Sequence, residues 1–166
     1  MSLTKSQPVW TSCGSNSYEI HKASVAVKML SGRYPTDMLR RHWTDNTAGY
    51  CLLTGCKPLL VQGTLEHLLL FCPSLGEKRQ TLLALVSRVS SEHPILRVIL
   101  ANLFCRSSNT QDLMQLLLDC SVVPYVIQAA QMFGDFIIER LLYVGRIWCY
   151  NIHRERVTQL GLLKFR

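Results

Sequence analysis

Apolar residues in the second half of the chain recur at steps of three and four, the spacing of one helix face. The first such run follows Ser74 and Glu77, which have the spacing of a capping box. A second helix is predicted from Pro94 to about Cys105, because proline fits the first helical turn. A third covers QDLMQLLLDC, capped by the end of the preceding loop CRSSNT. A long final helix is predicted from Pro124 onward.

Two apolar stripes support these helices. The stripe of the first helix comprises Leu75, Leu82, Val86 and Val89. The stripe of the final helix comprises Val126, Ala130, Phe133, Ile137, Leu141, Val144 and Trp148. We expect its part from Phe133 to Trp148 to be buried against the helices at 75–90 and 94–105.

The first half of the chain is less regular. Residues 1–15 are polar and lack periodicity, which predicts a disordered tail. Asn16, with Glu19 three positions later, predicts the start of a helix that ends at Gly32. A second, short helix, DMLRRHWT, is predicted after Pro35. The segment PLLVQGT could form one short strand.

The chain has 166 residues, of which 48% are hydrophobic, and this suits one domain with a sizeable core. Its formal net charge of +7 and pI near 9.2 favour an anionic partner such as nucleic acid. No stretch reaches the roughly 18 uncharged apolar residues of a membrane span, and no secretory signal is evident. With no signal and an odd count of seven cysteines, a disulfide framework is not expected, so we expect reduced thiols, in the cytoplasm or nucleus. We also expect no membrane partner.

The segment YCLLTGCKPLLVQGTLEHLLLFCPSL concentrates potential metal ligands, with the spacing Cys-x4-Cys-x10-His-x4-Cys. These four residues are Cys51, Cys56, His67 and Cys72. Zinc prefers four tetrahedral nitrogen and sulfur ligands, and a Cys3His set closes a structural site. Gly55 offers the backbone freedom for a tight turn that presents the first two sulfurs together. The alternative is that all four are ordinary packed residues, since buried cysteines are common.

The second pair of ligands needs a particular geometry. Thr64 is predicted to cap a helix that carries His67. On a straight helix, Cys72 would lie about 140° round from His67. Pro73 pushes Cys72 out of helical geometry, so the last turn can bend its thiol back toward the metal. His42 is a second-ranked candidate, because nine positions separate it from the first cysteine of the segment.

The motif GTLEHLLLFCPSLGEKR, preceded by YCLLTGC, resembles the zinc-binding segment that follows the polymerase in non-LTR retrotransposon reverse transcriptases. Those segments carry two cysteines and then ExxxHLLxxCPxxxxxR or close variants. The upstream LSGRYPTDMLRRHW resembles the helix-turn-helix lead-in found there, and the match covers roughly residues 25–80. The first cysteine pair departs from the family, because its gap is wider than the commoner two residues.

The resemblance implies that Zn2+ is held by Cys51, Cys56, His67 and Cys72, with Glu66 beside the histidine and Arg79 as the trailing arginine. It implies a nucleic-acid-binding module from the C-terminal part of a reverse transcriptase polyprotein, or a relic of one. Its partners would be RNA or DNA, preferably single-stranded, and the rest of the polyprotein. The chain has no Asp-Asp pair in an apolar hairpin and no nuclease cluster after its PTD, so we expect binding and not catalysis.

Basic residues flank the cysteine segment, with aromatic residues among them. Arginine and lysine neutralise phosphates, and exposed aromatic rings stack on unpaired bases. The predicted nucleic-acid-binding residues are Lys28, Arg33, Arg40, Arg41 and Lys57. In the alternative interpretation, Arg40 and Arg41 form a solvated helix face. The C-terminal HRERVTQLGLLKFR forms a second basic cluster.

Two other classes of function compete with this interpretation. The Leu-rich helices could bind a partner helix, which would make the chain a helical protein–protein interaction domain with a purely structural zinc. A cysteine hydrolase would use Cys149 and His153, which stand four apart on the final helix and could touch. Cys149 adjoins Trp148 on the apolar side, which favours a buried, inert thiol.

The sequence thus predicts an all-α protein with a small inserted zinc knuckle. Residues 1–15 would be the tail, and residues 16–73 would hold the N-terminal helices and the Cys3His knuckle. Residues 74–166 would form a helical bundle.

Overall fold

The computed structural model describes residues 15–40, 48–105 and 110–161, except for the side chains of Arg40 and Cys105. Within these ranges the secondary structure is helical and no strand is present, which confirms the all-α prediction. PLLVQGT forms no strand, and one isolated antiparallel bridge joins its Gln62 to Tyr50.

Helix α2, Ser17–Leu30, begins as the capping pattern predicts. The Asn16 side chain accepts a hydrogen bond of 2.8 Å from the Tyr18 N–H. Gly32, with φ of +68°, follows the end of the helix, in the left-handed conformation that glycine adopts without strain. Helix α3, Asp37–Arg40, is the described part of the second predicted helix, and the rest of that helix lies outside the described residues.

Helices α4 (Gly76–Glu92), α5 (Pro94–Cys105) and α6 (Thr110–Asp119) follow the predicted elements closely. The apolar stripe of α4 is buried, as predicted. The capping box was wrong, because a 3-10 turn, Pro73–Leu75, precedes α4 and no side chain caps its first turn. The Ser74 hydroxyl accepts a hydrogen bond from the Gly55 N–H across the fold instead.

The prediction of one long final helix was also wrong. Gly134, with φ of +110°, separates α7 (Pro124–Phe133) from α8 (Phe136–Gln159). Phe133 ends α7 and remains 46% exposed, which contradicts the expected burial of this residue. The other four residues of the expected core are buried, namely Ile137, Leu141, Val144 and Trp148.

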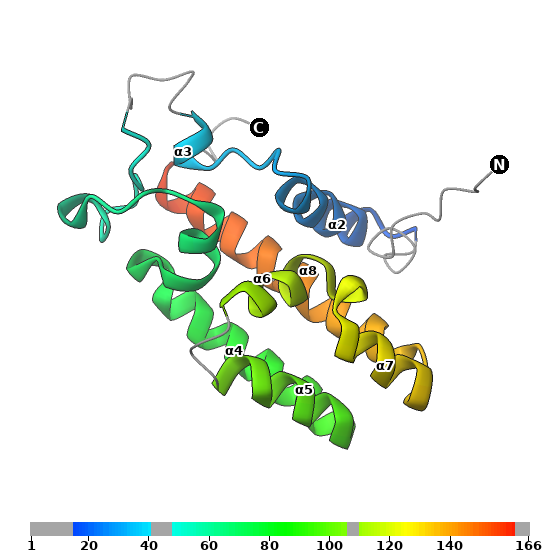
Figure 1. The fold of residues 1–166 in the computed structure, drawn as a ribbon. Helices are drawn as coiled ribbons and strands as arrows, with labels where there is room; N and C mark the ends of the chain where they lie inside the picture. Colours follow the sequence, from blue (N-terminus) through cyan, green and yellow to red (C-terminus); the bar gives the residue numbers. More distant parts are fainter. Residues whose placement is uncertain (1–14, 41–47, 106–109, 162–166) are drawn as a thin grey trace.

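Helix α8 is the centre of the molecule (Figure 1), and α2, α4, α6 and α7 all pack against it. Helix α5 packs on α4, and its Phe104 ring lies 5.4 Å from the Trp148 ring of α8. Gly145 lets α6 approach α8 closely, because a Cβ there would lie 2.3 Å from the Leu117 carbonyl oxygen. The cysteine segment lies beside the C-terminal half of α8 (Figure 1).

No single helix in the described ranges is long and apolar enough to cross a membrane. Thr110–Val122 and Pro124–Phe133 meet the length and composition criteria only as a pair, and a bend of 46° separates them. Leu117 and Val126, one from each member of the pair, are buried in the protein core.

Candidate metal centre

The first two cysteines lie on a loop that folds back on itself. The Cys51 N–H donates to the Val61 carbonyl over 2.8 Å, which joins the two ends of the loop. The Cys56 N–H donates to the Leu53 carbonyl over 2.9 Å and closes a tight turn. Leu60 adopts a φ of +49°, a left-handed conformation that is uncommon for leucine. Together these bonds bring the second sulfur back toward the first.

Gly55 is needed for a reason other than the predicted one. The φ angle of Gly55 is not positive, so the turn does not require a glycine backbone. A Cβ at Gly55 would instead lie 2.8 Å from the Ser74 Oγ. The missing side chain lets the Gly55 N–H reach that oxygen, also at 2.8 Å, and ties the loop to the segment before α4.

The last two ligands bracket a π-helical turn, His67–Phe71: His67 is its first residue, and Cys72 directly follows it. Thr64 caps this turn as predicted, since its Oγ1 accepts from the His67 N–H at 3.1 Å. The Cys72 N–H donates to the His67 carbonyl over 2.6 Å, a bond that spans five residues. Cys72 itself has a non-helical ψ of 116°, as expected of a residue before proline. The wider π turn, which the sequence reasoning missed, brings side chains five apart onto one side.

The four predicted ligands converge, and each is buried. Their ligand atoms, three Sγ atoms and one imidazole nitrogen, all lie within 4.8 Å of one another. The Cys56 Sγ lies 3.4 Å from the His67 Nε2 and 3.3 Å from the Cys72 Sγ. A tetrahedral site with metal–sulfur bonds near 2.3 Å needs sulfurs about 3.8 Å apart. These separations are therefore close to those of a metal site, and the cluster could hold a metal ion.

Arg79 contacts the cluster from α4. Its Nη2 donates to the Cys72 carbonyl over 2.6 Å, and its Nη1 is buried without a hydrogen-bond partner. The guanidinium interacts electrostatically with the thiols of Cys56 and Cys72. A positive charge at this place favours thiolates, which are the form of cysteine that binds a metal.

The surroundings favour the metal-binding forms of His67 and Cys72, whereas burial raises the pKa of the Cys56 thiol and opposes its ionisation. Burial, assisted by Arg79, lowers the pKa of His67, which favours the neutral imidazole that coordinates metals. A hydrogen bond from Cys51 lowers the pKa of the Cys72 thiol, whereas the same contact raises the pKa of Cys51. Backbone N–H groups of Leu53 and Ser74 also stabilise the thiolates of these cysteines. Cys72 therefore ionises first, and a bound cation would favour the loss of the remaining protons.

A buried ion pair attaches the cysteine loop to α8, and the sequence reasoning missed it. The Asp37 Oδ1 lies 2.7 Å from the Arg156 Nη2, and the Asp37 side chain is fully buried. The other carboxylate oxygen accepts from the Leu52 N–H at 3.3 Å, directly after the first ligand. Arg156 belongs to the predicted C-terminal basic cluster, but its side chain is 3% exposed and contributes no surface charge. No local signal marks a pair that is 119 residues apart.

The predicted nucleic-acid-binding residues are placed only in part. Lys28 on α2, Arg33 after it and Lys57 on the cysteine loop are exposed. Arg40 is the last described residue of α3, without a described side chain, and Arg41 lies outside the described residues. His42, the competing ligand, also lies outside them. The structure leaves nucleic-acid binding by this set a prediction.

Cys149 and His153, the two residues considered for a cysteine hydrolase, each contact another residue. The Cys149 Sγ–H donates to the Leu117 carbonyl over 3.8 Å, and burial raises its pKa to about 12. The His153 Nδ1 lies 3.1 Å from the Tyr34 hydroxyl, and burial beside Arg156 lowers the histidine pKa to about 4. This agrees with the interpretation of Cys149 as a buried, inert thiol.

Comparison with known proteins finds no family model, no curated protein and no solved structure that matches this chain. The properties of the site therefore rest on its own geometry.

Proposed function

We propose that the Cys3His cluster is a structural zinc site. Three sulfurs and one imidazole nitrogen are the donors that zinc takes in closed tetrahedral sites. All four ligands are buried and none of the set is left over for a substrate, which suits a structural role. The ion would hold the cysteine loop against the π-helical turn, two segments that are otherwise joined by few backbone bonds.

Metal analysis of the purified chain tests the site. We expect one zinc per chain, its loss in Cys56→Ser, and its retention in Cys120→Ser, a buried thiol outside the cluster. A chelator should unfold the cysteine loop locally, because most residues of the apolar core belong to the helices around α8 and not to that loop. A metal content near zero in carefully prepared protein would reject the proposal.

We further propose that the zinc-bound chain is a nucleic-acid-binding module, related to the C-terminal part of a non-LTR retrotransposon reverse transcriptase polyprotein. The single observation that carries this proposal is the convergence of the four residues at the motif positions of that family. The net charge of +7 and the exposed Lys28, Arg33 and Lys57 support an anionic partner. Three thiolates and Zn2+ carry a net charge of about −1, so phosphate contacts must come from these neighbouring cations.

Salt-dependent binding to labelled single-stranded RNA and DNA tests this function. The double variant Arg40→Gln with Arg41→Gln should keep zinc and helicity but weaken binding to all sequences alike. Its salt slope should fall by roughly 0.7 for each lost phosphate contact. The charge-matched control is Arg88→Gln with Arg97→Gln on the exposed faces of α4 and α5, and it should change little. A double variant with the affinity and slope of the parent would exclude Arg40 and Arg41 as phosphate contacts.

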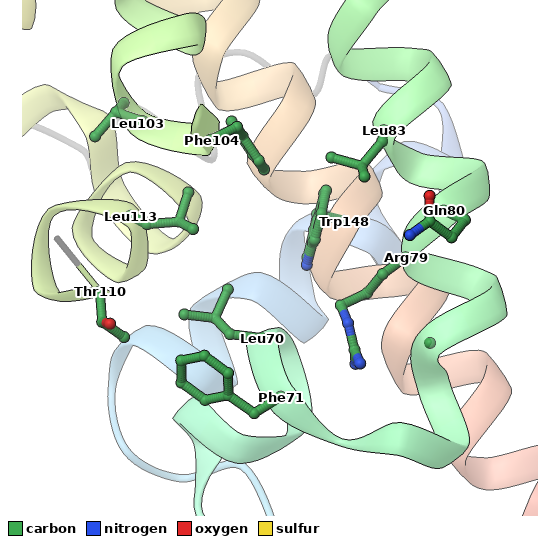
Figure 2. Close-up of a pocket in the computed structure, with 11 residues that line it drawn as sticks. Leu70, Phe71, Arg79, Gln80, Leu83, Leu103, Phe104, Thr110, Leu113 and Trp148 are labelled. Atoms are coloured by element: carbon green, nitrogen blue, oxygen red, sulfur yellow. The ribbon is translucent and has the colours of Figure 1, made fainter. Parts of the chain in front are cut away.

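A pocket beside the metal centre favours a second candidate, a protein-interaction domain whose zinc is purely structural. It encloses about 290 Å³, and Figure 2 shows Leu70 and Phe71 of the π-helical turn on one side of it, with Leu113 and Trp148 around it. Phe71 is 57% exposed although it is large and apolar. If the parent chain binds no nucleic acid even at low salt, this candidate becomes the better one.

A further inference from the structure

A groove of about 670 Å³ lies between the first turns of α2 and the C-terminal half of α8. Tyr18 and His21 line it from α2, and Tyr150, His153 and Arg154 line it from α8. No ligand of the metal centre and no residue of the cysteine loop contributes to its lining. The groove is therefore a separate feature of the surface, built on two helices that pack directly on each other.

The aromatic rings of the groove are held in place but remain accessible. The Tyr150 ring is buried and forms the floor, with the rings of Tyr18 and His21 each 5.6 Å away and edge-on to it. Tyr18 nevertheless keeps 50% of its surface exposed. The Lys22 ammonium lies 4.1 Å from the Tyr18 ring centroid and restrains that ring. A restrained, exposed aromatic ring is a platform on which an unpaired base can stack.

Two exposed cations accompany these rings. The Arg154 guanidinium lies 6.0 Å from the Tyr150 ring centroid, and Lys28 follows further along α2. Lys28 does not line the groove itself, but it acts electrostatically on His153, which does. Among the described residues, no carboxylate forms an ion pair with Lys28 or Arg154.

The acidic residues of the same helical segments have other partners. Glu19 pairs with Lys22 at 2.6 Å. The Glu155 carboxylate accepts a hydrogen bond from Gln159 and lines a different hollow, beside α4. The groove therefore combines uncompensated positive charge with flat aromatic surface, which is complementary to a chain of phosphates that carries unpaired bases.

We propose that the α2–α8 groove binds single-stranded nucleic acid, with a base stacked on Tyr18 and phosphates beside Arg154 and Lys28. The inference rests on the proposed nucleic-acid-binding function and gives it a second, defined contact surface. A duplex pairs and stacks its bases internally, so it would use only the cations of the groove and bind more weakly than a single strand.

Fluorescence anisotropy with the full zinc-loaded chain tests the groove, with a labelled single-stranded RNA and a duplex of the same sequence as probes. Tyr18→Leu should weaken binding of the single strand by about tenfold, because one base loses its stacking partner. Arg154→Gln should lower the salt slope by roughly 0.7. The matched controls are Tyr125→Leu, a half-exposed tyrosine of α7, and Arg97→Gln on α5. Circular dichroism checks that every variant keeps the helicity of the parent.

The outcomes separate the groove from the proposed function. If the parent binds RNA and both groove variants behave as their controls do, the groove is wrong and the function stands. In that case a protein partner would become the better candidate for the occupant of the groove. If Arg154→Gln alone weakens binding, and single strand and duplex bind equally, stacking on Tyr18 is excluded. A parent chain that binds neither probe at low salt overturns the function and the groove together.

Discussion

The buried ion pair between Asp37 and Arg156 allows a sharp test of how the cysteine loop is held on the fold. Asp37→Asn keeps the size of the side chain but removes its charge. The Arg156 guanidinium would then be buried without a counter-ion, because its 2.9 Å hydrogen bond to the Pro35 carbonyl and its contact with the Tyr34 ring supply no negative charge. Its Nε already lacks a partner in the parent structure.

The expected loss of stability is large. Breaking one side of a buried ion pair costs about 3 to 5 kcal/mol, because the remaining charge is stranded away from water. For a domain of this length, each kcal/mol lowers the melting temperature by about 2 to 4 °C, so the expected shift is roughly 6 to 20 °C. The chain supplies a matched control in Arg140 and Glu92, which pair at 2.8 Å with side chains 49% and 35% exposed. Arg140→Gln should cost only about 0 to 1 kcal/mol.

Urea unfolding followed by circular dichroism measures both variants. The double variant Asp37→Leu with Arg156→Met should recover part of the loss, since it leaves no stranded charge. Zinc content should be measured alongside, because Asp37 also accepts from the Leu52 N–H next to the ligand Cys51. If Asp37→Asn costs no more than Arg140→Gln, the pair does not hold the loop on α8 and the reasoning fails.

Three further predictions concern packing, the metal and pH. Gly145→Ala should destabilise the chain by about 1 to 3 kcal/mol despite the better helix propensity of alanine, because its Cβ would meet the Leu117 carbonyl. The control Gly76→Ala has room for a Cβ and should be neutral or stabilising. Urea unfolding of both variants measures the difference. Arg79→Met should weaken zinc binding by about 10- to 100-fold in a chelator competition, while Arg88→Met should not. Equal zinc affinities of the two variants would show that Arg79 does not support the site. The pKa of His153 near 4 lies below its ordinary 6.5, so the folded chain resists protonation and its stability should fall as pH drops from about 6.5 to about 4. In melting curves, His153→Asn should lose less stability at low pH than the parent does. Identical pH profiles would show that His153 does not cause the loss. The metal ligands are the same in both proteins, so their acid sensitivity cancels in the comparison.

Local signals account for the parts of the molecule that the sequence predicted well. Helix spacing, the Asn16 cap, Gly32 and the prolines at helix starts act within one or two turns, and the structure follows them. The ligand set was predicted for the same reason, since all four residues fall within one short segment whose turns are set by nearby residues. Gly134 is a local signal that was overlooked, and it explains why α7 and α8 are separate and why Phe133 remains exposed.

The remaining features depend on segments that meet only in the folded chain. Asp37 and Arg156 are 119 residues apart, and neither carries a mark of burial until α8 packs beside the cysteine loop. From the sequence, Gly55 was predicted to form a turn and Ser74 to cap a helix. In the structure, both residues instead take part in one hydrogen bond between distant segments. The rings of Tyr18 and Tyr150 form a groove only because α2 lies along α8. Short-range backbone preferences can be read from the residues in order, whereas the pairing of buried charges and the shape of a surface depend on which helices the shared apolar core brings together.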